Sequence, residues 1–415
     1  MDARFAVLPV ASSAGDVAMS LHLEETLTHI IADYSEQLEK LGGEIVDRAP
    51  ADGTPLLFFV LTGGTERKIL DVWEERGGAD KPLLLITHPS QNSLPAALEA
   101  LARVRQLGGR GRILYLRGQC DAACFSAIDA AVRDVETHAR LRATRIGIVG
   151  APSDWLVASS PDPKTVQTTW GPHLVDIPLE RLQQAYSAGT GDALALDILG
   201  MAERSSVETA AVGEAADLHS ALQRVIEEEQ LDSLALRCFD IISDLGTTAC
   251  LALSHLNDRG MIAACEGDAV SNVAMLWVRE LLEVVPWMAN PARVDEGEGM
   301  LLLAHCTVPR GLVETYELTT HFESTIGVGI AGEVPAGDVT LIRIGGTNLD
   351  ELWLYEGEIV RGPHDDELCR TQVHVVVGSE AIRDLLTDPL GNHIVLVAGH
   401  HEARLRAWWK MFIGG

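Results

Sequence analysis

Apolar and polar residues in the first third of the chain follow two alternating periods. Short apolar runs have the length of buried strands, and they lie at residues 5–8, 56–61, 82–87 and 112–116. Longer stretches with apolar residues at helical spacing separate these runs, at residues 21–41, 66–75 and 93–107. Because strands that alternate with helices form parallel sheets, we predict a doubly wound α/β domain at residues 1–144.

A second α/β domain is predicted at residues 145–285, and a β-rich domain at residues 286–415. The second domain shows the same alternation, with strands expected at residues 145–150, 234–237 and 261–264. From about residue 286 the period shifts toward two, and turns rich in Gly, Pro and Asp separate the apolar runs. The expected fold class is therefore α/β, with two doubly wound α/β domains followed by a C-terminal β-barrel-like domain.

Composition narrows the classes of protein to which the chain can belong. No apolar run reaches the roughly 18 residues that a membrane span needs. The start of the chain lacks the basic region and the long apolar region of a signal peptide. Seven cysteines are scattered without paired spacing, which is typical of a reducing compartment. We therefore expect a soluble, cytoplasmic protein.

The net charge of -28 results from 60 acidic and 32 basic residues. Such a surface repels phosphate backbones and anionic lipids, so we expect neither nucleic acid nor a membrane as a partner. The same charge disfavours a strongly anionic substrate, unless a local basic pocket overrides it.

An acidic turn in the middle of the chain is the first candidate for chemistry. Glu266 and Asp268 lie where the strand at residues 261–264 ends and a helix begins. Carboxylates at a buried strand end are costly unless a cation or hydrogen bonds stabilise them, and Mg²⁺ and Mn²⁺ prefer oxygen ligands. Asp268 has a second interpretation as the N-cap of the following helix, which requires no metal.

Two histidines lie at the ends of predicted strands in the β-rich domain. His305 follows the apolar run at residues 300–304, and His393 precedes a strand expected at residues 394–397. A single histidine in such a position is usually a satisfied structural residue. Imidazole is nevertheless an acceptable ligand for Mn²⁺, so the pair could complete a site with Glu266 if the β-rich domain closes over it.

Several segments resemble the active-site framework of the L-fucose and L-arabinose isomerases, most closely the L-fucose isomerase-like branch. The most specific segments keep the family's order along the chain, at residues 264–268, 288–291, 303–307 and 391–399. Further similar segments lie at residues 62–66, 88–98 and 150–159. The resemblance covers about residues 55–415. It implies a fucose isomerase-like fold and a homo-oligomer, a trimer or hexamer, whose active sites are shared between subunits.

The resemblance also implies one divalent metal ion, Mn²⁺ or alternatively Mg²⁺ or Co²⁺. Glu266 matches the first metal-binding glutamate of the family, and His393 matches its C-terminal histidine. His305 matches an intermediate histidine that is a ligand in the arabinose branch. Asn290 takes the position of the second metal-binding carboxylate. We predict Glu266 as the general base and Asp268 as a further catalytic candidate.

Asn290 departs from the family pattern, and this departure affects the predicted reaction. Isomerisation through an enediol needs one group that takes the C2 proton and another that manages the hydroxyl protons. An asparagine can ligate through its carbonyl oxygen but cannot accept a proton at neutral pH. Glu266 therefore acts with another acid, for which Asp268, Asp295 and Glu296 are near in sequence, or the chain catalyses a related reaction.

The missing carboxylate also bears on the substrate. With Asn290 the metal site carries one positive charge more than in the family, which favours a substrate with its own oxyanion. A sugar acid and a sulfonated or phosphorylated sugar are examples. The net charge of -28 counts against such a substrate.

By resemblance, part of the substrate site comes from the first domain. His88, Gln91 and Asn92 belong to a stretch that, in these isomerases, reaches into the site of a neighbouring subunit. Amides and an imidazole suit the recognition of sugar hydroxyls. The alternative is a loop that caps the helix beginning at Ser93.

Other side chains are candidates for the wall of the site. Trp155 could stack on a sugar ring or pack in the core. Asn392 adjoins the predicted ligand His393. His321 and Glu323 alternate along an expected strand, so they face one side and either line the pocket or form a solvated pair.

The predicted function is a metal-dependent aldose–ketose isomerase that acts on a small sugar or sugar derivative through an enediol or enediolate. Two alternatives remain open. One is another metal-dependent enzyme on the same scaffold, an epimerase or a carbon–carbon lyase. The other is a non-catalytic sugar-binding protein with a degenerate site.

Overall fold

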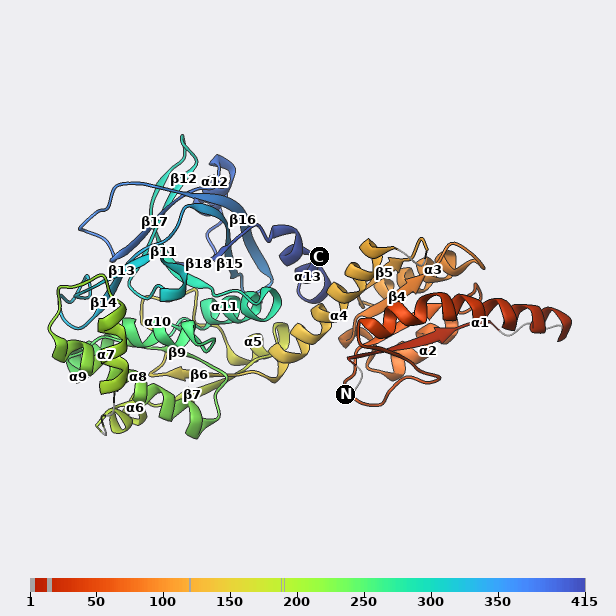
Figure 1. Ribbon diagram of the computed structural model, residues 1–415, viewed down its shortest axis with the longest axis horizontal. Coiled ribbons are helices and arrows are strands. Elements are labelled where there is room, and N and C mark those ends of the chain that lie inside the picture. Colours follow the sequence, from red (N-terminus) through yellow and green to blue (C-terminus); the bar gives the residue numbers. More distant parts are fainter. Residues whose placement is uncertain (1–3, 13–16, 119–120, 188, 190, 415) are drawn as a thin grey trace. The chain divides into compact units, whose positions relative to one another are not determined.

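The computed structural model describes residues 4–12, 17–118, 121–187, 189 and 191–414. It forms two compact units, Met1–His138 with Trp408–Ile413 and Ala139–Ala407. The chain passes from the first unit to the second within α4 (Ala122–Ala143) and returns within α13 (Glu402–Phe412) (Figure 1). None of the described helices combines the length and the apolar character that a membrane span requires.

The first unit is built on a five-stranded parallel sheet with the order β2-β1-β3-β4-β5. Its strands are β1 (Phe5–Val10), β2 (Gly43–Ile45), β3 (Leu56–Val60), β4 (Leu83–Thr87) and β5 (Gly111–Tyr115). Leu57 and Phe59 pack with α1 (Val17–Lys40) and α4, whereas Phe58 and Val60 pack with α2 (Glu66–Glu75) and α3 (Ser93–Gln106). Helices therefore cover both faces, and the predicted doubly wound fold is confirmed.

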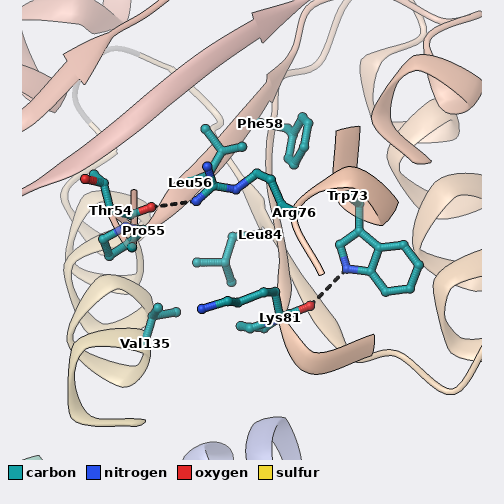
Figure 2. Close-up of a pocket in the computed structure, with 11 residues that line it drawn as sticks. Thr54, Pro55, Leu56, Phe58, Trp73, Arg76, Lys81, Leu84 and Val135 are labelled. Atoms are coloured by element: carbon teal, nitrogen blue, oxygen red, sulfur yellow. Dashed lines mark hydrogen bonds between the residues drawn. The ribbon is translucent and has the colours of Figure 1, made fainter. Parts of the chain in front are cut away.

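The first unit contains a cavity of about 40 Å³, and Figure 2 shows residues that line it. The Arg76 guanidinium donates to the carbonyl oxygen of Thr54 at 2.8 Å, and Trp73 Nε1 donates to that of Lys81 at 2.9 Å. Thr54 and Lys81 precede β3 and β4, so the cavity lies at the amino-terminal edge of the sheet. Doubly wound sheets bind ligands at the opposite edge, where the predicted residues His88, Gln91 and Asn92 lie.

The second unit begins with a four-stranded parallel sheet of the order β10-β9-β6-β7. Its strands are β6 (Arg145–Val149), β7 (His173–Ile177), β9 (Ser233–Leu236) and β10 (Ile262–Ala264). The helices of this part are α5 (Pro163–Thr169), α6 (Leu179–Tyr186), α7 (Asp192–Met201), α8 (Thr209–Glu229), α9 (Cys238–Leu245), α10 (Cys250–Asp258) and α11 (Ala269–Leu282). The strand order reverses between β6 and β9, and ligands of such sheets collect beyond the carboxyl ends of the strands near this point.

The rest of the second unit contains a closed barrel of the order β11-β12-β17-β16-β15-β18. Its strands are β11 (Trp287–Asp295), β12 (Met300–His305), β15 (Gly337–Gly345), β16 (Glu351–Val360), β17 (Thr371–Val376) and β18 (Ile394–Ala398). A small sheet joins β8 (Arg204–Ser205), β13 (Thr315–Thr319) and β14 (Gly329–Glu333), and α12 (Ser379–Thr387) packs on β12 and β16. The predicted β-barrel-like part is confirmed.

Helix α11 joins the two layers of the second unit. It packs on β9 and β10 of the parallel sheet and also on β15 and β18 of the barrel (Figure 1). Eleven of its residues are buried, because its apolar residues surround the helix rather than forming one stripe. The loop before α11 therefore lies where the carboxyl edge of the sheet meets the barrel.

Candidate active site

The turn after β10 holds Glu266 in an uncommon backbone conformation. Glu266 has a φ of 60° and the following Gly267 has a φ of 70°. A Cβ on Gly267 would lie 2.5 Å from the carbonyl oxygen of Ala151. Backbone hydrogen bonds from Ser153 N to Glu266 O and from Gly267 N to Leu236 O, both 2.8 Å long, hold the turn against its neighbours. Non-glycine residues with positive φ persist where surrounding contacts fix them, often at functional sites.

Glu266, His305 and His393 converge at this edge of the sheet. One potential ligand atom from each side chain lies within 4.8 Å of the others, and all three side chains are buried. The ring centroids of the two histidines are 5.6 Å apart, and His393 Nε2 lies 3.5 Å from Glu266 Oε1. Among the described residues, this is the one group of three or more His, Cys, Asp and Glu side chains so arranged.

His393 is oriented by Asp268. Its Nδ1 lies 2.8 Å from Asp268 Oδ2, while Asp268 also caps α11 by accepting from Ser271 N at 2.8 Å. Asp268 thus serves as the N-cap that the sequence allowed, and it contacts His393 as well. Because Nδ1 of His393 is engaged, its Nε2 is the nitrogen that faces Glu266. A histidine held in this way by a carboxylate is the usual arrangement of a metal ligand.

The second histidine is fixed by a hydroxyl group. His305 Nδ1 lies 2.8 Å from Thr307 Oγ1, which leaves Nε2 as the nitrogen that can meet a ligand. Burial and the neighbouring His393 lower the pKa of His305 to about 4. The ring is therefore neutral at neutral pH, as metal coordination requires.

Asn290 lies on β11, the strand next to that of His305. It is paired with Ala304 across β11 and β12, next to His305. Its Oδ1 is buried and, like His393 Nε2, has no hydrogen-bond partner among the described residues. Buried polar atoms are nearly always paired, so these two call for a partner that is not part of the chain. One carboxylate and two imidazoles form a donor set that fits Mn²⁺ or Co²⁺ better than Mg²⁺.

Two opposing effects determine the charge of the cluster. Burial opposes ionisation of Glu266, but His393 and a 2.5 Å hydrogen bond from Trp155 Nε1 lower its pKa below the usual value. Burial also opposes the charge of His393, yet Asp268 and Glu266 raise its pKa to about 9. At neutral pH a proton on His393 therefore balances part of the carboxylate charge, a role that a divalent cation can also fill.

Trp155 forms part of the wall next to Glu266. Its ring is 51% exposed and meets Phe239 edge to face at a centroid distance of 5.0 Å. Phe239 in turn meets His321 at 5.8 Å. The exposed ring is therefore available for stacking, in contrast to the alternative of core packing.

The segment around His321 differs from the predicted strand. It forms a turn after β13, in which Thr325 N donates to His321 O at 2.9 Å and Thr325 adopts a φ of 60°. The predicted alternation of His321 and Glu323 is therefore wrong, because this backbone hydrogen bond closes a turn instead of a ladder. Glu323 is an exposed residue, but desolvation of its carboxyl group and the nearby charge of Glu266 raise its pKa.

The substrate-binding residues predicted in the first unit lie in the loop after β4. His88 is buried, and its ring nitrogens lie 3.0 Å from Leu61 O and 3.0 Å from Ser90 Oγ. Gln91 and Asn92 are exposed and adopt φ values of 56° and 57°. In the second unit, Asn392 is exposed beside the buried His393.

Arg343 belongs to the surroundings of the site, although the sequence pattern did not single it out. Its side chain is 2% exposed and lies 3.5 Å from Asp268 Oδ2. The signal in the sequence is an arginine in the apolar strand at residues 339–344. A charged residue at a buried strand position requires a partner, so this position could have been flagged.

Comparisons with known proteins add a class of activity. No protein-family model matches the chain. The sulfoquinovose isomerase of Alkalicoccus urumqiensis is 25% identical over 321 residues, which cover 72% of this chain and 70% of that protein. The sulfoquinovose isomerase of Clostridium sp. (strain MSTE9) is 26% identical over 309 residues, or 70% of this chain and 68% of that protein. The sulfoquinovose isomerase of Priestia megaterium is 29% identical over a shorter match of 140 residues, which covers 32% of this chain and 31% of that protein.

The chain is accordingly an enzyme of the isomerase class. At this level of identity the similarity supports the broad group of sugar isomerases related to the fucose and arabinose isomerases. The architecture, with parallel α/β sheets followed by an antiparallel barrel, is consistent with a fucose isomerase-like fold.

Proposed function

We propose that the chain is a divalent-metal-dependent aldose–ketose isomerase that acts on a sugar derivative through an enediol or enediolate. One observation carries this proposal above the others. Glu266, His305 and His393, which are far apart in the sequence, meet with their potential ligand atoms within 4.8 Å at the carboxyl edge of a parallel sheet. The relatives support the class of activity.

Glu266, His305 and His393 would hold the ion, with Asn290 Oδ1 as a further donor. Mn²⁺ is the first choice and Co²⁺ the second, since imidazole suits these ions better than it suits Mg²⁺. When bound, such an ion polarises the two substrate oxygens and stabilises the negative charge that develops on them.

Glu266 is the proposed general base. Its lowered pKa keeps the carboxylate ionised at neutral pH, so that it can accept the C2 proton. The hydrogen bond from Trp155 Nε1 to Oε2 fixes the side chain, and Oε1 faces His393. The backbone of the turn is held by its neighbours, so the base is positioned before substrate binds.

A second group has to manage the hydroxyl protons, because Asn290 cannot. Asp295 lies at the far end of β11, roughly 17 Å along the strand from Asn290 at about 3.3 Å per residue. Asp268 is fully buried and engaged by Ser271 and His393. Glu323 is the better candidate, since its carboxyl is influenced by the charge of Glu266 and has a raised pKa that favours a protonated acid.

For the substrate we propose a sulfonated aldose, with sulfoquinovose as the first compound to test. The names of the relatives support this choice, and so does the absence of a second carboxylate at Asn290, which favours a substrate that brings its own negative charge. We further propose a homo-oligomer, a trimer or hexamer, in which the loop with His88, Gln91 and Asn92 contributes to the site of a neighbouring subunit. Light scattering on the eluted protein tests the assembly.

The decisive experiment is turnover of a sugar panel by the purified chain with added MnCl₂. Sulfoquinovose, L-fucose, L-arabinose and a phosphorylated aldose are compared by NMR in D₂O. Formation of a ketose with deuterium at C2 of re-formed aldose supports the proposal. An aldose inverted at C2 without ketose would indicate an epimerase, and a shortened carbon skeleton would indicate a lyase. No turnover together with well below one bound ion per chain would indicate a sugar-binding protein.

A further inference from the structure

Arg343 occupies an unusual place in the barrel. Side chains alternate along β15, so Arg343 lies on the same side as Val339 and Leu341, which belong to the apolar core of the barrel. Its side chain is nevertheless charged and 2% exposed. A buried guanidinium is destabilising unless its donors are all satisfied, so the contacts of Arg343 define its role.

Those contacts reach three different segments around the candidate site. Nη1 donates to Ser271 Oγ at 2.9 Å, Nη2 donates to Ser159 Oγ at 2.6 Å, and Nη1 also donates to His393 O at 3.2 Å. Ser271 lies in the first turn of α11, behind the Glu266 turn, and Ser159 follows Trp155 in the loop after β6. One guanidinium thus connects the backbone of His393 with the segments that carry Glu266 and Trp155.

The carboxylate of Asp268 completes the arrangement. Asp268 Oδ2 lies 3.5 Å from Arg343 Nη1 and 2.8 Å from His393 Nδ1, and it accepts from Ser271 Oγ at 2.7 Å. Asp268 is fully buried, so these contacts fix the position of its carboxyl group.

We propose that Arg343 is a positioning residue of the active site, which together with Ser271 holds Asp268 Oδ2 against His393 Nδ1 and thereby keeps the His393 ring with Nε2 directed at Glu266. This inference rests on the proposed function, because it assigns the role of these contacts in holding the metal ligand His393. It also makes Asp268 a positioning residue rather than a proton-transfer group.

The local backbone is adapted to this side chain. Gly391 has a φ of 140°, and a Cβ at this position would collide with the Arg343 guanidinium. The glycine therefore admits the side chain close to the segment that carries His393. Lysine can supply the charge at residue 343 but not the planar set of donors, and glutamine can supply donors but not the charge.

The test is a double-mutant cycle on Mn²⁺ binding by the full chain, measured by EPR titration. We expect Arg343→Met and Asp268→Asn each to weaken binding by about 10- to 100-fold, the range found for residues that support a metal ligand. If Arg343 acts through Asp268, the double variant binds no more weakly than the weaker single variant. Two effects that multiply, or an Arg343→Met variant within twofold of the wild type, would overturn the proposal.

Conservative variants keep the test valid if Arg343→Met does not fold. Arg343→Lys should stay within a few-fold of the wild type, whereas Arg343→Gln should lose affinity because it lacks the charge. Equal affinities of the lysine and glutamine variants would contradict the proposal. The matched control is Arg310, which forms a 3.2 Å ion pair with Asp258 elsewhere in the second unit. Arg310→Met should lower the melting temperature and leave Mn²⁺ affinity unchanged.

A measurement without metal separates this inference from the proposed function. In metal-free protein labelled with ¹⁵N-histidine, the His393 ring is identified by the signal that His393→Gln removes. We expect a proton on Nδ1 in the wild type. The His393 signal should change in Arg343→Met and in Asp268→Asn, and it should stay the same in Arg310→Met. An unchanged signal in Arg343→Met would refute the positioning role, whereas a wild type that binds no Mn²⁺ would refute the proposed function alone.

Discussion

The loop after β4 in the first unit and the turn after β10 in the second share a backbone conformation but differ in the surroundings of their side chains. Each follows a buried parallel strand and contains two consecutive residues with positive φ, Gln91 and Asn92 in one and Glu266 and Gly267 in the other. In the first loop the strained side chains are exposed. In the second, Glu266 is 7% exposed and faces side chains from distant segments.

The two regions also differ in whether the ring nitrogens of their buried histidines have hydrogen-bond partners. The ring nitrogens of His88 are taken up by Leu61 O and Ser90 Oγ, so this histidine is complete within its own unit. His393 Nε2 and Asn290 Oδ1 are buried without a hydrogen-bond partner in the part of the chain described. Positive φ values occur both in the loop after β4 and in the turn after β10, so they do not by themselves identify the candidate active site. The feature that distinguishes the second region is the convergence of Glu266, His305 and His393, and the following experiments examine it.

The largest effect is expected from Glu266→Gln. The variant keeps the size and the hydrogen bonding of the side chain but removes the base, so turnover should fall by about 10²- to 10⁴-fold. Initial rates of ketose formation measure it. Glu99→Gln, at an exposed position of α3, is the matched control and should leave turnover unchanged. Near-normal turnover of the Glu266 variant would show that the base has been misassigned.

The second-largest effect is expected from Mn²⁺, which should stabilise the second unit and not the first. An ion that binds only the folded state stabilises it by about 2.7 kcal/mol at 100 times its dissociation constant, so Mn²⁺ should raise the melting temperature of the second unit by several degrees. EDTA should reverse the shift and abolish turnover, and Mn²⁺ should restore both.

Calorimetry of variants tells whether the predicted ligands cause this shift. His305→Gln and His393→Gln should abolish the Mn²⁺-induced rise, whereas His88→Gln should retain it. A shift that survives both of the first two variants would mean that Mn²⁺ binds elsewhere.

The sequence predicted the fold best where strands are buried on both faces. The strands expected at residues 56–61 and 82–87 agree with β3 and β4 to within one residue at each end, because every position of β3 and β4 is buried and all except Thr87 are apolar. Neither β7 nor β11 was predicted. β7 is partly exposed along its length, and Pro291 with the adjacent shift in register interrupts the pattern of β11.

The site was predictable only in part for a related reason. Glu266, His305 and His393 were found through resemblance, and the N-cap role of Asp268 follows from local sequence. The contact between Asp268 and His393 joins residues 125 positions apart, and no period or local motif encodes it. Arg343 was missed because the pattern of a strand shows which positions are buried but not which partners a buried charge has.

Removal of the His88 ring should affect stability and leave the metal site intact. His88→Gln leaves the buried carbonyl oxygen of Leu61 without its present partner, which costs about 1–3 kcal/mol of the free energy of unfolding. Urea denaturation measures this loss. The dissociation constant for Mn²⁺ should remain that of the wild type, and a weaker constant would instead tie the loop after β4 to metal binding.

Trp155→Phe should have the smallest effect, and it carries a pH dependence whose sign is fixed. The variant keeps an aromatic ring next to Phe239 but removes the hydrogen bond to Glu266 Oε2, which helps to hold the pKa of this carboxyl down. Without it the pKa of Glu266 rises, so the carboxylate base is lost at a higher pH as acid is added. The acid limb of the rate profile should therefore move toward higher pH, and kcat/KM at neutral pH should fall only a few-fold, as for one hydrogen bond of about 1 kcal/mol.

Trp73 of the first unit offers the matched control, since its Nε1 donates to the carbonyl oxygen of Lys81 (Figure 2). Trp73→Phe should cost a similar amount of stability without moving the acid limb. An unmoved limb in Trp155→Phe would show that the hydrogen bond does not tune the base.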